Sequence, residues 1–140
     1  MPVPLLQLHQ VSKNFNDGDV RGEVKALGEV SFTVEKGEFL SIIGPSGCGK
    51  STLLRIMAGL TRPSTGECLH KGEPVTRPSL ERGYVFQEPR LFPWLTVLEN
   101  ISLAGGRGEE LLEKMDLTGF GQALPHELSG GMASRVALAR

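Results

Sequence analysis

Apolar and polar residues alternate, or apolar residues form short blocks, through much of the first half of the chain. Alternation with a period of two predicts half-buried strands, and a short continuous apolar block predicts a strand buried on both faces. These patterns predict strands at residues 5–11, 30–34, 39–43, 67–70 and 83–87. Residues 12–28 are mostly polar and contain glycine, so we expect a loop or a hairpin connection there.

Helical spacing of apolar residues replaces this pattern in the second half. It predicts helices at about residues 50–60, 96–103, 109–115 and from residue 130 onward. Thr96 and Glu99 have the spacing of a capping box, and Ser129 is a good N-cap for the last helix. The order of elements indicates an α/β fold, with a sheet-bearing core at about residues 1–87 and a helical part at about residues 88–140.

Composition narrows the class of protein. The 140 residues allow one domain, and 39% apolar residues are enough for a globular core. Lys and Arg number 15 against 16 Asp and Glu, so the basic excess of a nucleic-acid-binding surface is missing. We expect neither a membrane-spanning helix, which needs ~20 apolar residues, nor a secretory signal. Cys48 and Cys68 lack metal-ligand spacing and are expected to be reduced thiols in a cytosol.

The strongest chemical signal lies between the predicted strand at 39–43 and the predicted helix that begins at residue 50. The phosphate-binding pattern G-x-x-x-x-G-K-[ST] is matched in full by Gly44, Pro45, Ser46, Gly47, Cys48, Gly49, Lys50 and Ser51. A strand, a glycine-rich turn and a helix in this order direct backbone N–H groups and a helix N-terminus at one anion. Lys50 is expected to reach the β- and γ-phosphates of a nucleotide, and the Ser51 hydroxyl to reach Mg²⁺. The motif predicts a nucleoside-triphosphate site; the alternative is a chance glycine-rich loop with a solvated lysine.

A second motif starts the last predicted helix. Ser129 can cap it, and Gly130 and Gly131 leave its first backbone N–H groups uncovered. Taken alone, this pattern fits an ordinary capped helix with a flexible start equally well. Its place downstream of a phosphate-binding loop is what makes it specific.

Three motifs in order resemble the nucleotide-binding subunit of ATP-binding cassette (ABC) transporters: the loop at 44–51, Gln87 in a Q-loop, and the signature at 128–132. The resemblance covers all 140 residues and implies a P-loop NTPase of the ABC ATPase type. Such a fold has a mixed sheet core, here with an abbreviated helical subdomain and without its C-terminal part. Met132 and the segments 91–97 and 136–140 look most like the nitrate, sulfonate and taurine importer group.

The resemblance implies roles for residues of the phosphate site. Lys50, Ser51 and Thr52 would hold phosphate and Mg²⁺. Phe15 would stack on the adenine ring, although a buried loop aromatic is the alternative. Gln87 would touch Mg²⁺ and the attacking water, and its loop would face the membrane subunit; the alternative is a polar residue at the end of a strand.

The signature residues imply a dimer. Ser129, Gly130 and Gly131 would contact the γ-phosphate of ATP held by the P-loop of a second subunit, so that each ATP lies between two chains. Phe92 and Trp94 are aromatic residues of an expected exposed loop and would dock on the membrane subunit, with a local core as the alternative.

The function implied is that of an ATPase subunit at the cytoplasmic face of a membrane, which powers import of a small oxyanion or organosulfur solute. ATP and Mg²⁺ are the expected cofactors. A second copy, integral membrane permease subunits and a periplasmic or surface solute-binding protein are the expected partners, without nucleic acid. Two alternatives stay open at this stage: a soluble ABC ATPase of DNA repair or translation, and a nucleotide-binding fragment without turnover.

The family pattern continues past the signature with an apolar strand that ends in Asp-Glu and then a switch histidine, and this sequence has neither. His126 precedes the signature and is expected to be a solvated turn residue. The sequence stops at Arg140 inside an apolar-periodic helix, which predicts a truncated protein. Residues 1–140 alone are therefore expected to bind Mg·ATP weakly and to lack measurable hydrolysis.

Overall fold

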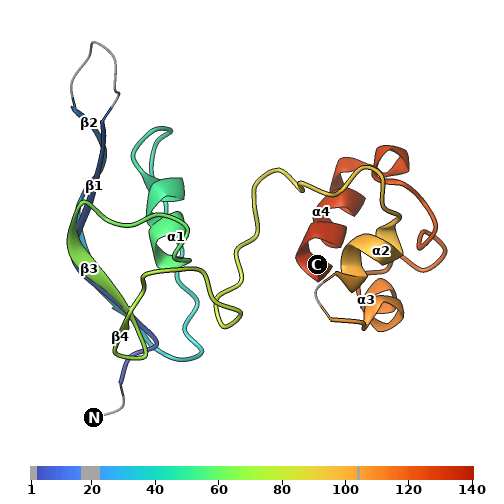
Figure 1. Cartoon of the computed structure of the whole chain (residues 1–140), viewed down its shortest axis with the longest axis horizontal. Coiled ribbons are helices and arrows are strands. Elements are labelled where there is room, and N and C mark those ends of the chain that lie inside the picture. Colours follow the sequence, from blue (N-terminus) through green and yellow to red (C-terminus); the bar gives the residue numbers. More distant parts are fainter. Residues whose placement is uncertain (1–2, 17–22, 104) are drawn as a thin grey trace. The chain divides into compact units, whose positions relative to one another are not determined.

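The computed structural model describes residues 3–16, 23–103 and 105–140, which form two compact units. The first unit is Met1–Tyr84 and the second is Val85–Arg140. The first contains the sheet and one helix, and the second is helical (Figure 1). Each unit has its own hydrophobic core.

The sheet of the first unit has four strands in the order β2-β1-β3-β4. These are β1 (Leu6–Asn16), β2 (Glu23–Val34), β3 (Thr65–His70) and β4 (Glu73–Pro74). All pairs among them are antiparallel; Leu8, for example, lies opposite Phe32 on one side and Cys68 on the other. The predicted strands at 5–11, 30–34 and 67–70 are confirmed within these longer bounds.

The first hairpin is longer than the sequence pattern indicated. We expected a loop or hairpin connection at 12–28, but residues 12–16 continue β1 and residues 23–28 belong to β2. Residues 17–22, where the hairpin connection was expected, lie outside the described part of the chain. The polar side chains here do not prevent a strand, because β1 and β2 stay paired as far as Asn16 and Glu23, despite register shifts between Leu8 and Asn14.

Helix α1 (Lys50–Met57) lies against this sheet (Figure 1). Leu53 and Ile56, three residues apart on one face, are buried in the same core as Leu8, Val11 and Leu27 of the hairpin. This packing places the N-terminal end of α1 close to β2, and the residue before the helix is Gly49 of the phosphate-binding pattern.

Two predicted strands are not formed. Residues 39–43 are extended but unpaired, and Phe39 and Ile43 are each 92% exposed. None of the strands in the described residues pairs with this segment, and a parallel strand cannot form without a neighbour to receive its hydrogen bonds. Residues 83–87 also lack a partner strand in this part of the chain, and the boundary between the two units falls inside them.

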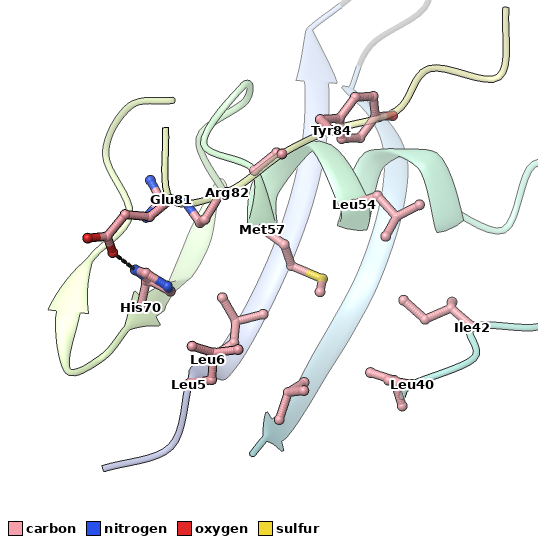
Figure 2. Close-up of a pocket in the computed structure, with 13 residues that line it drawn as sticks. Leu5, Leu6, Leu40, Ile42, Leu54, Met57, His70, Glu81, Arg82 and Tyr84 are labelled. Atoms are coloured by element: carbon pink, nitrogen blue, oxygen red, sulfur yellow. Dashed lines mark ion pairs between the residues drawn. The ribbon is translucent and has the colours of Figure 1, made fainter. Parts of the chain in front are cut away.

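An apolar groove of about 400 Å³ lies beside α1 in the first unit (Figure 2). Leu54 and Met57 of α1 line it together with Leu40 and Ile42 of the unpaired segment. His70, Glu81 and Arg82 gather at the polar end of the groove (Figure 2). Leu6 of β1 and Val34 of β2 also line the groove, so it lies between α1, the sheet and the unpaired segment.

The second unit contains α2 (Val97–Ser102), α3 (Gly108–Lys114), the 3₁₀ turn η1 (Pro125–Glu127) and α4 (Gly130–Ala139). The three predicted helices of this region are confirmed. Their core is formed by Val97, Ile101, Leu112, Leu117, Val136 and Ala139. Arg135 of α4 donates to the carbonyls of Met115 (2.7 Å) and Asp116 (3.2 Å), which fastens α4 to the end of α3.

The predicted capping box at the start of α2 is confirmed. The Thr96 hydroxyl accepts from the backbone N–H of Glu99 at 3.2 Å, and the Glu99 carboxylate accepts from the backbone N–H of Thr96 at 2.7 Å. This backbone hydrogen bond, and then the one from the Thr96 hydroxyl, hold the pKa of Glu99 below its usual value. The box fixes where the preceding loop ends and the helix begins.

Candidate functional site

The loop from Gly44 to Gly49 adopts backbone conformations that only glycine accepts easily. Gly47 and Gly49 have φ angles of +80° and +97°. Gly49 also lies against β2, since a Cβ atom built there would be 2.5 Å from the Ala26 carbonyl oxygen. The glycine at this position therefore lets the loop pass close to the hairpin and turn into α1.

The turn that follows leaves backbone donors at the loop. The N–H of Leu53 donates to the Gly49 carbonyl at 2.8 Å, which closes the first turn of α1. The N–H groups of the residues before it have no carbonyl one turn earlier to bond, and they face out of the helix end. Such a set of N–H groups, at the positive end of a helix, favours an anion.

The ammonium group of Lys50 lies over the loop. Its Nζ donates to the carbonyls of Gly44 (2.7 Å) and Pro45 (2.6 Å) and lies 3.7 Å from the Cys48 sulfur. The chain thus places a positive charge across the same loop whose N–H groups are available. A phosphate group would bind this ammonium more strongly than the neutral carbonyls do, and would displace them.

A pocket of about 330 Å³ opens at this loop. It is lined by Gly47, Gly49, Lys50, Ser51, Thr52, Val24, Lys25 and Ala26. The first five are predicted site residues, which the structure brings together. The other predicted loop residues, Gly44, Pro45, Ser46 and Cys48, are exposed on the loop and lie outside this lining.

Sequence reasoning missed the contribution of β2, residues 24–26, because these residues fall within the expected loop or hairpin connection at 12–28. Pairing with β1 turns it into a rigid wall of the pocket. A signal was present in the alternation of Val24 and Ala26 with charged Lys25, which continues into the predicted strand at 30–34. Lys25 adds a second cation to the pocket lining.

Phe15 lies on β1 directly opposite Val24. Cross-strand partners share a face of the sheet, so the ring stands on the face where Val24 lines the pocket. The ring is 46% exposed, and the Lys13 ammonium lies 5.0 Å from its centre. The proposed stacking role has the necessary exposed surface, and Phe15 lies in a strand instead of a buried loop.

A substitution of Gly49 tests how tightly the loop depends on β2. Gly49→Ala would place a methyl group against the Ala26 carbonyl and force a side chain into a left-handed backbone region. We expect a loss of about 1–3 kcal/mol in the free energy of unfolding and weaker nucleotide binding, measured by urea denaturation and fluorescent-nucleotide titration. Gly83→Ala is the control, since a Cβ there meets open space at an ordinary φ. An equal effect of both changes would contradict the steric argument.

The remaining predicted residues belong to the second unit. Gln87 is exposed at a bend in the irregular segment that begins this unit, and it does not end a strand. Ser129 caps α4, since its hydroxyl accepts from the Met132 N–H at 3.3 Å. Gly130 and Gly131 are exposed, and a Cβ at either position would meet open space. The start of α4 is therefore uncovered within its own unit.

The loop between residues 91 and 96 presents two aromatic rings. Phe92 and Trp94 lie 5.3 Å apart by ring centres, and Trp94 is 72% exposed. Arg140 closes the other side of Phe92, with its guanidinium 5.4 Å from the ring. The rings contact each other, but Trp94 is not part of a core.

Asn100, which is fully buried in α2, holds this loop. Its side-chain oxygen accepts from the Phe92 N–H at 2.9 Å. Its amide nitrogen donates to the carbonyls of Phe92 (3.2 Å), Leu95 (3.0 Å) and Thr96 (3.0 Å). One buried side chain thus satisfies four backbone groups of a segment that has no regular structure of its own.

The described residues add neither a metal cluster nor a reactive thiol to this site. Within the described residues, no cluster of three or more His, Cys, Asp or Glu side chains is placed to hold a metal. Both cysteines are free, and burial raises the pKa of Cys68 to about 11, with Arg82 opposing less strongly. His126 is exposed in η1, as expected of a turn residue. No helix of the described residues is long and apolar enough to cross a membrane.

Comparison with known families identifies the class. The sequence model described as "ABC transporter" matches residues 27–140, which include the phosphate-binding loop, Gln87 and the signature. The chain therefore belongs to the ABC transporter family, and this prediction is confirmed.

Individual relatives refine the comparison. An aliphatic sulfonates import ATP-binding protein SsuB from Bacillus cereus is 46% identical over 143 residues, covering 96% of this chain and 56% of that protein. A taurine import ATP-binding protein TauB from Pelagibacter ubique is 47% identical over 132 residues, covering 86% of this chain and 50% of that protein. The chain spans about half the length of these relatives. The predicted resemblance to the sulfonate and taurine group is confirmed, and these relatives do not support the soluble alternative.

Solved structures agree on the fold. The dimeric ATP-binding cassette MJ0796, in a post-hydrolysis state bound to ADP and Pi, matches with a TM-score of 0.82 and 34% sequence identity. The match covers 96% of this chain and 67% of that one. The predicted fold class, a P-loop NTPase of the ABC ATPase type, is confirmed.

Proposed function

We propose that this chain is the nucleotide-binding part of an ATPase subunit that powers import of a small oxyanion or organosulfur solute. The observation that carries the proposal is the pocket at the start of α1, where glycine backbone, free helix N–H groups and Lys50 converge. The names of the SsuB and TauB relatives support the transport role and the solute class.

Each wall of the pocket would hold a different part of ATP. The loop N–H groups and Lys50 would bind the β- and γ-phosphates, and Thr52 would add a hydroxyl donor. Phe15 would stack on the adenine ring from the exposed face of the hairpin. Lys25 lines the pocket. In our proposal it would contact the nucleotide near the α-phosphate or the ribose, between the phosphate-binding loop and the adenine ring.

The Ser51 hydroxyl of the pocket fits Mg²⁺ as a ligand. This ion prefers hard oxygen ligands and bridges phosphate oxygens while it keeps several waters. Ser51, in the first turn of α1, is exposed at the pocket and offers a hydroxyl oxygen, and Gln87 offers an exposed amide oxygen. When bound, Mg²⁺ would neutralise the charge that develops on the transferred phosphoryl group. Ser51 and Gln87 are the two proposed ligands from the protein.

Catalysis by this chain would consist of positioning and charge stabilisation. Lys50 would offset the negative charge that builds up on the phosphate oxygens, and Gln87 would orient the attacking water. These two residues are the proposed catalytic residues. The general base that accepts the proton of the water is not among the residues we assign.

The surfaces left uncovered within each unit would receive the proposed partners. A second copy would place the phosphates of its ATP against Ser129, Gly130 and Gly131, where open space is available. Membrane permease subunits would dock beside Gln87 and Trp94, which keeps the protein at the cytoplasmic face of the membrane. A periplasmic or surface solute-binding protein would deliver the solute to the permease.

A substitution at Ser129 tests the dimer. Ser129→Arg is expected to leave ATP binding to the monomer nearly intact, because Ser129 contacts only its own helix within the second unit. The same change should block ATP-driven dimerisation, since a long cation would occupy the space meant for the partner's phosphates. Fluorescent-nucleotide titration and analytical ultracentrifugation with ATP would measure the two effects on the complete protein.

Glu113→Arg is the control, because Glu113 is exposed on α3, a different helix of the same unit from the one that Ser129 caps. It should leave both monomer binding and dimerisation unchanged. A loss of monomer binding in Ser129→Arg as large as the loss of dimerisation would mean that the signature acts within one chain, against the proposal.

A further inference from the structure

A second polar pocket lies in the first unit. It shares no lining residue with the proposed nucleotide pocket at the start of α1, and it adjoins the apolar groove beside α1, with which it shares His70, Glu81 and Arg82. Its volume is about 330 Å³. Its walls come from the end of β3, from β4 and from the loop that follows β4. Two arginines of this loop, Arg77 and Arg82, line it.

The Arg82 guanidinium is held in place by one hydrogen bond, but another of its N–H groups has no acceptor among the described residues. Its Nη2 donates to the Arg77 carbonyl at 2.8 Å, which fixes the guanidinium plane. Its Nε is buried and has no hydrogen-bond partner in the described part of the chain. A buried guanidinium N–H without an acceptor is costly, so this group points to an acceptor that a ligand would provide.

The charges around the pocket favour an anion as that ligand. Glu81 is already compensated, because its carboxylate accepts from Lys71 at 2.8 Å and lies 3.7 Å from the His70 ring nitrogen. Figure 2 shows the His70–Glu81 pair beside Arg82. Among the described residues, neither Arg77 nor Arg82 has a carboxylate within ion-pair distance. The two guanidinium charges are therefore available.

The protonation states of the neighbours leave this balance in place near neutral pH. The hydrogen bond from Lys71 is the main reason that the pKa of Glu81 lies below its usual value. Burial, followed by the charges of Arg82 and Lys71, holds the pKa of His70 below its usual value. His70 is then a neutral imidazole and Glu81 an ionised partner of Lys71.

We propose that this pocket binds a small protonated oxyanion of the hydrogen phosphate class. Arg77 and Arg82 would bind its oxygens, with charge-assisted hydrogen bonds from the buried Nε of Arg82. The Ser79 hydroxyl already accepts from the Glu81 N–H at 3.2 Å, which leaves its own proton free to donate to the ligand.

Glu73 gives the pocket its selectivity. This carboxylate lines the pocket, where it would repel a fully ionised sulfate. The same carboxylate accepts a hydrogen bond from a P–OH group, so hydrogen phosphate gains a contact that sulfate cannot make. The bound anion would tie the loop after β4 to the β3–β4 hairpin, five residues before Gln87.

The experiment separates this pocket from the proposed nucleotide site by using protein that carries Lys50→Ala, which removes the main cation of that site. Inorganic phosphate, sulfate and chloride are titrated at constant ionic strength, with isothermal calorimetry and thermal unfolding as readouts. We expect phosphate to bind and to raise Tm, sulfate to bind at least tenfold more weakly, and chloride to have no effect.

Two variants locate the binding. Arg82→Gln is expected to weaken phosphate binding at least tenfold, and Arg77→Gln, a change at an exposed side chain, tests the same pocket without disturbing the fold. Arg62→Gln, exposed in the same unit, is the control and should bind phosphate like the parent protein. Unchanged phosphate binding in both pocket variants, equal or tighter sulfate binding, or absence of phosphate binding would each overturn the proposal. Because all of these proteins carry Lys50→Ala, a failure of the proposed nucleotide site does not change the phosphate binding that is measured here.

Discussion

Lys50→Ala is expected to weaken ATP binding by roughly a hundredfold, the largest functional effect that we foresee. The ammonium lies 2.7 Å and 2.6 Å from two loop carbonyls and would exchange them for phosphate oxygens when a nucleotide binds. A hydrogen bond between charged groups contributes about 1.5–3 kcal/mol, and each 1.4 kcal/mol is about tenfold in affinity. Fluorescent-nucleotide titration of the complete protein would measure the effect.

Two further variants separate charge from loop structure. Lys36→Ala removes the same charge from an exposed turn and should leave ATP affinity unchanged. Lys50→Arg keeps the charge but changes the donor geometry, so it should retain part of the affinity. Equal ATP affinity in Lys50→Ala and the parent protein, with unchanged thermal unfolding, would refute the assignment of the phosphate site.

Asn100→Leu is expected to reduce the free energy of unfolding of the second unit by about 3 kcal/mol. The change removes the hydrogen bonds of the Asn100 side chain to the Phe92 N–H and to the carbonyls of Phe92, Leu95 and Thr96. The Phe92 and Thr96 carbonyls keep a backbone partner, so the main losses are at the Phe92 N–H and the Leu95 carbonyl. A leucine has the same branched shape and is somewhat larger, so the loss would come from backbone groups left without partners and not from a cavity. The loop that carries Trp94 would open first, since Asn100 holds it to α2.

The only tryptophan of the sequence makes this measurable. Urea denaturation followed by Trp94 fluorescence reports the loop, and far-ultraviolet circular dichroism reports the helices. Glu113→Leu, an exposed change on α3, is the control and should shift the transition by less than about 0.5 kcal/mol. If Asn100→Leu shifted the transition as little as this control does, the prediction would be wrong, and water would have replaced the lost hydrogen bonds.

Local signals in the sequence were sufficient for several features. The capping box at Thr96 and Glu99, the N-cap at Ser129 and the glycines of the phosphate-binding loop were all predicted correctly as local structure. Each depends on hydrogen bonds or backbone angles within a few residues of chain. These features need no contact with distant residues, so a short stretch of sequence is enough to predict them.

Features that depend on distant partners were predicted less well. The apolar block at 39–43 fits a buried strand by composition, yet its residues are exposed because no strand of the described residues lies beside them. The opposite error occurred at 12–16 and 23–28, where polar residues form strands because the two segments pair with each other. A strand forms only when it pairs with another strand, and the residue pattern of one segment does not identify that second strand.

The sequence by itself determined the class of protein, the phosphate-binding loop and the helix starts, because each rests on closely spaced residue types. The tertiary structure alone decided that Val24, Lys25 and Ala26 form a wall of the nucleotide pocket, since they reach it only through the β1–β2 pairing and the contact of Gly49 with β2. It also decided that Asn100 is buried where it bonds several backbone groups, and that the Arg82 Nε is buried without an acceptor among the described residues. Both are properties of what surrounds a side chain, and those surroundings come from segments that only folding brings together.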